Sequence, residues 1–174
     1  MRKQLDRLYS ASGVLAAGFI ALICLVVSAQ VTLNLISKIF GSEYSYTIPS
    51  YADFAGFFLA SASFLALAYT LKRGGHIRVT LLIQTFGRIP RFFAEIFSLT
   101  IGAIISAFAT YYMILQNIDS YNYGDMSVGM VAIPIWIPQL SVSIGLLILT
   151  IAFIDLIWET LRAGRPILKN SETE

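Results

Sequence analysis

Residues 8–37 read LYSASGVLAAGFIALICLVVSAQVTLNLIS and contain no charged side chain. A helix needs about 20 apolar residues to cross the roughly 30 Å hydrocarbon layer of a membrane, and this run exceeds that length. Three further uncharged apolar runs follow it. Because backbone amides in lipid must pair within their own segment, each run predicts an α-helix. The expected spans are about residues 11–37, 52–71, 93–118 and 132–158.

The composition supports a membrane protein. Apolar residues make up 57% of the 174 residues and charged residues 13%, and the mean hydropathy is +0.74. A soluble domain is about a quarter charged, so a water-soluble enzyme and a disordered chain are both excluded. The net charge of +2 is too small to indicate nucleic-acid binding. We predict an all-α integral membrane protein, with residues 1–174 forming a single membrane domain.

The positions of Lys and Arg predict the orientation. Only Lys38, among 12 basic residues, lies outside three groups: the N-terminal tail, the connection between spans two and three, and the C-terminal tail. The positive-inside rule places these three groups, and with them both termini, in the cytoplasm. Residues 27–29 (VSA) resemble a signal-peptide cleavage site, but the apolar run continues well beyond them, so we expect the first helix to be retained.

Two features of the helix ends can be predicted. Ser50 and Asp53 have the spacing of a capping box at the start of span two, with the Ser50 side chain as the N-cap. Tyrosine and tryptophan favour the headgroup level, and they gather near the predicted ends of the spans. Tyr9 and Trp158 would mark the cytoplasmic interface.

The connection between spans two and three is too charged to cross the membrane but carries regularly placed apolar residues. A short amphipathic helix at about residues 77–87, lying in the interface with its arginines toward lipid phosphates, is the preferred interpretation. A cytosolic helix packed on a partner is the alternative. The basic residues of this region are candidates for anchoring to lipid or to a partner: Lys72, Arg73, His76, Arg78 and Arg88.

The spans lack the usual residues of transport or catalysis. No ionisable residue lies near the middle of a span, where ion pathways are usually marked. Asp155 and Glu159 lie at a span end, where water or headgroups could solvate them. His76 is the only histidine, and no hydrolase or metalloprotease motif is present. We therefore predict no catalytic residue, no metal site and no cofactor, although a phospholipid could bind at the interface.

Small residues at four-residue spacing predict close helix packing, because they let backbones approach each other in lipid. Such rows occur in spans one, three and four, and they do not distinguish an internal neighbour from another subunit. The residues expected to contribute are Gly13, Ala17, Ala21, Gly102, Ser106 and Gly145.

Residues 73–79 (RGGHIRV) resemble a stretch of the small membrane subunit of TRAP (tripartite ATP-independent periplasmic) transporters. In that family an acidic residue commonly follows, before a leucine pair, but here Thr80 occupies that position. Asp53 at the start of span two, and Pro134 with Trp136 near span four, also match the family pattern. The length and the four spans agree over nearly the whole chain.

The resemblance implies a heteromeric transporter of the bacterial inner membrane. A periplasmic binding protein would capture a carboxylate substrate of the sialic acid or dicarboxylate class, and a large membrane subunit would import it with sodium. The present chain would scaffold the large subunit, which would hold the coupling sodium ion. The two alternatives from other classes are an integral membrane enzyme that modifies lipid and a homo-oligomeric channel.

Within this interpretation the outer loops would help to dock the binding protein. Exposed acidic and aromatic residues at these loops are the candidates, and they are Glu43, Tyr44, Tyr46, Asp119, Tyr121 and Asp125.

Overall fold

The computed structural model describes residues 2–41, 46–73 and 88–163, and its regular structure there is entirely helical. Each helix is long and apolar enough to cross a membrane. The predicted class, an all-α protein with four membrane-crossing helices, is therefore confirmed. The helices are α1 (Arg2–Phe40), α2 (Tyr51–Lys72), α4 (Arg88–Tyr123) and α5 (Trp136–Ala163).

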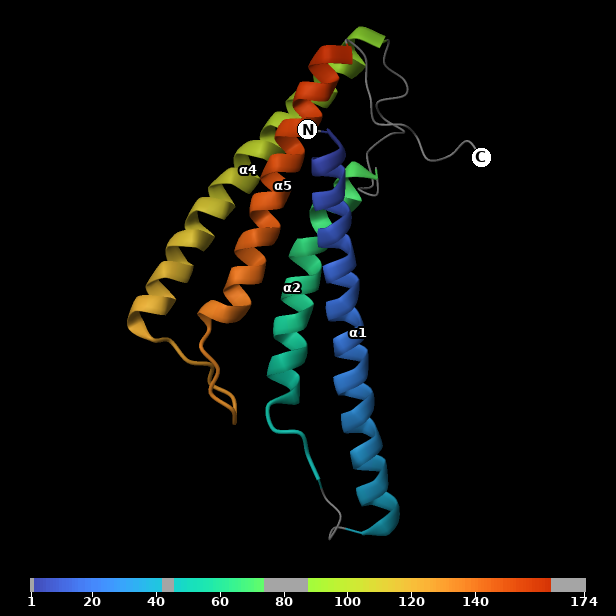
Figure 1. Cartoon of the computed structure of the whole chain (residues 1–174), viewed down its shortest axis with the longest axis vertical. Helices are drawn as coiled ribbons and strands as arrows, with labels where there is room; N and C mark the ends of the chain where they lie inside the picture. Colours follow the sequence, from blue (N-terminus) through green and yellow to red (C-terminus); the bar gives the residue numbers. More distant parts are fainter. Residues whose placement is uncertain (1, 42–45, 74–87, 164–174) are drawn as a thin grey trace.

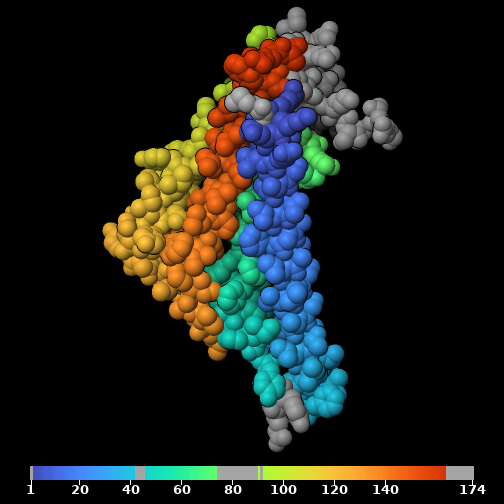
Figure 2. Space-filling view, in the orientation of Figure 1, coloured from blue at the N-terminus to red at the C-terminus, as the bar shows by residue number. Residues whose placement is uncertain are grey.

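The helices alternate in direction along the bundle (Figure 1). We call the end with Arg2, Lys72 and Ala163 the terminal end, and the end with Phe40 and Trp136 the loop end. Packing follows the order α1, α2, α5 and α4, since α1 lies along α2, α2 along α5, and α5 along α4. Figure 2 shows α2 recessed between α1 and α5. Helix α4 packs on α5 and touches the other helices only marginally.

Helix α1 extends beyond the bundle at the loop end (Figure 1). Its 39 residues correspond to about 58 Å at 1.5 Å per residue. The hydrocarbon layer is only about 30 Å thick, so α1 must project beyond it or tilt strongly.

The core lies between α2 and α5, where small and branched apolar side chains interlock. Ala68 and Ala152 are fully buried, and Leu156 is almost so. Many large apolar side chains instead face outward, among them Leu25, Phe97 and Ile104. This distribution is expected of helices surrounded by lipid, where apolar surface need not be hidden.

Three glycines of the predicted packing residues lie at helix crossings. A Cβ added at Gly13 would lie 2.8 Å from the ring of Tyr69 in α2, and one at Gly102 would lie 2.6 Å from Phe153 in α5. A Cβ at Gly145 would lie 2.6 Å from the backbone of Phe64. These glycines therefore serve internal contacts in the structure.

The remaining predicted packing residues differ in burial. Ser106 is buried in α4, whereas Ala17 and Ala21 are exposed on α1. The buried seam of α1 runs through Ser12 and Ala16, one position away from the predicted row. Of the predicted row on α1, Gly13 packs inside this chain but Ala17 and Ala21 do not, so four-residue spacing did not follow the packed face along the helix.

Hydroxyl pairs also join the helices. Ser61 in α2 donates a hydrogen bond of 2.9 Å to Ser141 in α5, and the Thr110 and Thr150 hydroxyls of α4 and α5 lie 3.2 Å apart. Each of these four hydroxyls also lies within hydrogen-bond distance of a carbonyl in its own helix. The polar groups inside these contacts are therefore satisfied within the chain, which lipid requires.

The predicted capping box at α2 is wrong. Ser50 is the N-cap residue, but its backbone is left-handed (φ 57°) and its side chain makes no capping hydrogen bond. Instead, the Ser50 hydroxyl accepts a 2.9 Å hydrogen bond from the backbone amide of Val131, in the loop between α4 and α5. Gly129 of that loop lies so close to Asp53 that a Cβ there would clash with its carboxylate. The Ser50 hydroxyl therefore bonds to the loop between α4 and α5 and not to an amide in the first turn of α2.

Gln30 joins α1 to the loop before α2. It is 3% exposed, and its carbonyl oxygen accepts a 2.8 Å hydrogen bond from the backbone amide of Ile48. Its amide nitrogen donates to Asn34, one turn further along α1. A polar side chain that the sequence places within a long apolar run thus positions the loop.

Gln30→Leu is expected to lower the free energy of unfolding in detergent by about 1–2 kcal/mol, because the Ile48 amide loses its acceptor. Thr32→Val is a matched control, since the Thr32 hydroxyl bonds only to the Ser28 carbonyl of its own helix. Denaturant titrations of both variants would measure the difference. Equal stability of the two variants would contradict a role for Gln30 in the loop.

Candidate functional site

A cluster of charged side chains lies at the terminal end and joins three helices. The Lys72 ammonium of α2 donates to Asp155 at 2.8 Å and to Glu159 at 3.0 Å, both on α5. Arg2 of α1 forms an ion pair with Glu159, and the Tyr9 hydroxyl lies 3.5 Å from Asp155. The two carboxylates share one face of α5 because they are four residues apart. We call these five residues the charged cluster.

The charged cluster balances its own formal charge, with two cations against two carboxylates. The side chains of Lys72, Asp155 and Glu159 are only 18–21% exposed, whereas Arg2 is largely exposed. Attraction between charges that are mostly shielded from water is screened less than at a free surface. The arrangement therefore links α2 to α5, and Arg2 adds α1 at its exposed edge.

The cluster corrects two sequence interpretations. The carboxylates of Asp155 and Glu159 are not left to water or headgroups, because Lys72 holds both. Tyr9 is not an exposed interfacial aromatic residue, because it is only 2% exposed. The signal that could have indicated the cluster was an acidic pair at i and i+4 near one span end, with a lysine ending another span at the same level.

The other predicted anchoring residues are placed only in part. Arg73 is exposed, with its guanidinium 4.8 Å from the centre of the Tyr69 ring. Arg88 is the first residue of α4. His76, Arg78 and the expected interfacial helix at about residues 77–87 lie outside the described residues. Anchoring by these residues stays a prediction.

The loop end carries the predicted docking residues that are described. Tyr46 and Tyr121 are exposed, and the Tyr121 ring meets Trp136 edge to face, 5.7 Å between centroids. Asp119 and Asp125 are also exposed. Glu43 and Tyr44 lie outside the described residues. Tyr46 lies in the connection between α1 and α2, whereas Asp119, Tyr121 and Asp125 lie where α4 passes into the loop before α5.

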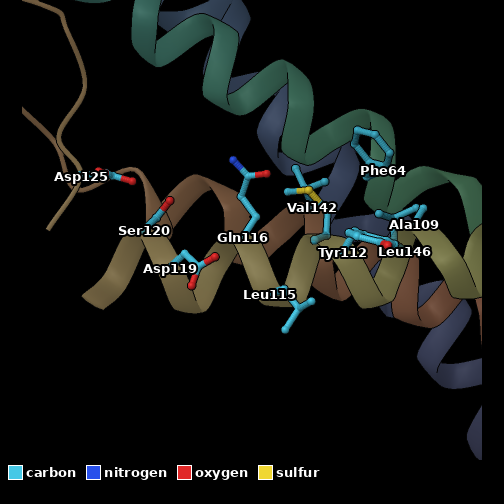
Figure 3. Close-up of a pocket in the computed structure, with 11 residues that line it drawn as sticks. Phe64, Ala109, Tyr112, Leu115, Gln116, Asp119, Ser120, Asp125, Val142 and Leu146 are labelled. Atoms are coloured by element: carbon cyan, nitrogen blue, oxygen red, sulfur yellow. The ribbon is translucent and has the colours of Figure 1, made fainter. Parts of the chain in front are cut away.

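Asp119 and Asp125 border an open groove of about 720 Å³ between α2, α4 and α5 (Figure 3). Apolar side chains of all three helices line most of it, including Phe64, Met113 and Val142. Gln116 and Ser120 join the two carboxylates toward the loop end. The sequence did not predict this groove, because the open space depends on how three helices pack against one another.

Among the described residues there is no group of three or more His, Cys, Asp or Glu side chains placed to hold a metal ion. The two acidic residues of the charged cluster, Asp155 and Glu159, are held by Lys72. The arrangement suits helix assembly through ion pairs and apolar packing.

Comparison with known proteins agrees with the four-helix architecture. Residues 23–163 match the family model described as "Tripartite ATP-independent periplasmic transporters, DctQ component". No curated protein and no solved structure matches the chain. The matched region covers well over half of the sequence and includes the last part of α1, from residue 23 onward, and all of α2, α4 and α5. The chain therefore belongs to the DctQ family, the small membrane component of TRAP transporters.

Proposed function

We propose that this chain scaffolds the large membrane component of a sodium-driven TRAP transporter that imports a carboxylate of the sialic acid or dicarboxylate class. In this proposal the large component carries the substrate and the coupling sodium ion. The loop end faces the periplasm and helps to dock the binding protein. Both termini face the cytoplasm, because the basic residues gather at that end.

One observation carries the proposal: hydroxyl groups at the contacts of α5 with α2 and α4 bond to each other within the chain. Ser61 pairs with Ser141, and Thr110 lies against Thr150, each pair closing a contact between two helices. A carrier site for an anion or a sodium ion would need several polar groups around a space near the middle of the membrane. The polar residues of the groove lie instead toward its loop end. Transporter membership supports this interpretation over the lipid-modifying enzyme, since the family consists of transporter components.

Reconstitution in liposomes tests the scaffold role. We expect sodium-dependent uptake when the large component, this chain and the binding protein are all present. Uptake should fall to background when this chain is omitted or when it is the only membrane component. Accumulation of solute by this chain alone would contradict the proposal, and single-channel currents from it would favour the channel alternative.

The same vesicles test docking at the loop end. Glu43→Lys is expected to weaken uptake at low binding-protein concentration while leaving co-purification of the two membrane components unchanged. Lys3→Glu, near the opposite end of α1, is the control. Unchanged uptake by the Glu43 variant would remove that residue from the docking surface.

A further inference from the structure

We propose that the groove between α2, α4 and α5 receives one membrane-spanning helix of the large component, and that this helix carries a Lys or Arg near its periplasmic end, facing Asp119 and Asp125. The inference rests on the proposed function and deepens it, because it names the surface and the chemistry of the partner.

The groove exists because α4 is supported on one side only. Helix α4 packs along α5 and makes at most marginal contact with α2. On the side facing α2, the space left open is about 720 Å³, with Phe64 on one wall and Ala109 on the other. Helices in membranes associate by filling such spaces with side chains, since lipid gives little hydrophobic drive of its own. A row of side chains from one further helix would complete this packing.

The lining changes character along the groove. Toward the bundle centre it is apolar, with Val142 and Leu146 at its base. Toward the loop end it becomes polar and then acidic, as Figure 3 shows for Gln116, Asp119 and Asp125. Neither Asp119 nor Asp125 belongs to the ion pairs found among the described residues. An apolar helix with a cation at its outer end matches this sequence of surfaces.

The charges disfavour two other occupants. A second copy in the same orientation would bring its own acidic loop end, where Lys38 is the only basic residue. Like charges brought together at an interface cost free energy. An anionic phospholipid would bring its net negative charge toward the two carboxylates. A helix with a basic residue avoids both conflicts.

Filling the groove tests the proposal. Ala109→Trp places an indole where the partner helix would lie, because Ala109 lines the groove. Ala107→Trp is the matched control, since Ala107 is an exposed alanine on the same helix that does not line the groove. In mild detergent we expect Ala109→Trp to weaken binding of the large component about tenfold and Ala107→Trp to leave it unchanged. Equal retention of the partner by both variants would overturn the proposal.

Photo-crosslinking gives a second measurement that does not depend on tolerance of a bulky side chain. A photoreactive amino acid at Leu115, which lines the groove, should crosslink to the large component in membranes that contain the complex. The same group at exposed Phe108, which does not line the groove, should do so far less. Crosslinks from Leu115 only to lipid, or only to a second copy of this chain, would overturn the proposal.

Charge-reversal variants identify the basic residue of the partner helix. Asp119→Lys together with Asp125→Lys should lower co-purification about tenfold, and changing the matching Lys or Arg of the large component to Glu should restore it. Failure of every such reversal would contradict the predicted cation. Failure of the unmodified chain to bind the large component at all would instead contradict the scaffold role, so the two outcomes are distinguishable.

Discussion

Lys72→Met is expected to lower the free energy of unfolding by about 3 kcal/mol, because Lys72 takes part in two of the ion pairs found among the described residues. The substitution leaves the Asp155 and Glu159 carboxylates close together on α5 and mostly shielded from water. Removing one partner of a buried ion pair costs about 3–5 kcal/mol, and the remaining exposure of these side chains places the loss toward the lower limit. Denaturant unfolding in detergent, followed by circular dichroism, would measure it.

A compensating variant separates the charged cluster from anchoring to lipid. Lys72→Met combined with Asp155→Asn and Glu159→Gln removes the unpaired charges, and we expect it to recover most of the lost stability. Arg73→Met removes a neighbouring exposed cation that contacts only the Tyr69 ring among its described interactions, so its effect should be below about 1 kcal/mol. If the triple variant were no more stable than Lys72→Met, the lysine would have its main partner outside this chain.

Gly145→Leu is expected to prevent α2 and α5 from packing. Even one added carbon at Gly145 would lie 2.6 Å from the backbone of Phe64, and a backbone cannot rotate away as a side chain can. Gly145→Ala should therefore lose about 1–3 kcal/mol, and the leucine variant should not yield folded protein. Thermal unfolding of the alanine variant and recovery of the leucine variant after detergent extraction are the measurements.

Gly56→Ala is the control for this prediction. Gly56 lies on α2, and an added Cβ there meets nothing within 4 Å. Its replacement should leave the stability unchanged or slightly raised, because alanine favours helix. A loss at Gly56 as large as that at Gly145 would show that helix flexibility, rather than close approach, explains the effect.

Several of the packing contacts were accessible from residue patterns. Gly13, Gly102 and Gly145 were expected at helix crossings, and each lies at one. Ala17 and Ala21 were chosen by the same pattern and are exposed. Spacing along a helix identifies which residues share a face, but it does not say whether that face meets another part of the chain, a partner or lipid.

Contacts between distant segments account for what the patterns missed. Ser50 has the local spacing of a cap, yet its hydroxyl bonds to Val131 in another loop. Lys72 is a basic residue at the end of a span, which is typical of an interfacial anchor, yet two carboxylates of α5 bind its ammonium group. In both cases the partner of the polar group comes from a distant segment of the chain. The spacing of residues near that group does not predict such a partner.

The amino-acid sequence by itself determined the four helices and pointed to the family. Lipid obliges each long apolar run to satisfy its own backbone, and the RGGHIRV stretch resembles that of the family. The tertiary structure decided which faces meet, which charges pair and where the groove between α2, α4 and α5 remains open. Those features depend on the relative positions of helices separated by tens of residues. They require the helices to be packed together, as the approach of Gly145 to the backbone of Phe64 shows for α5 and α2.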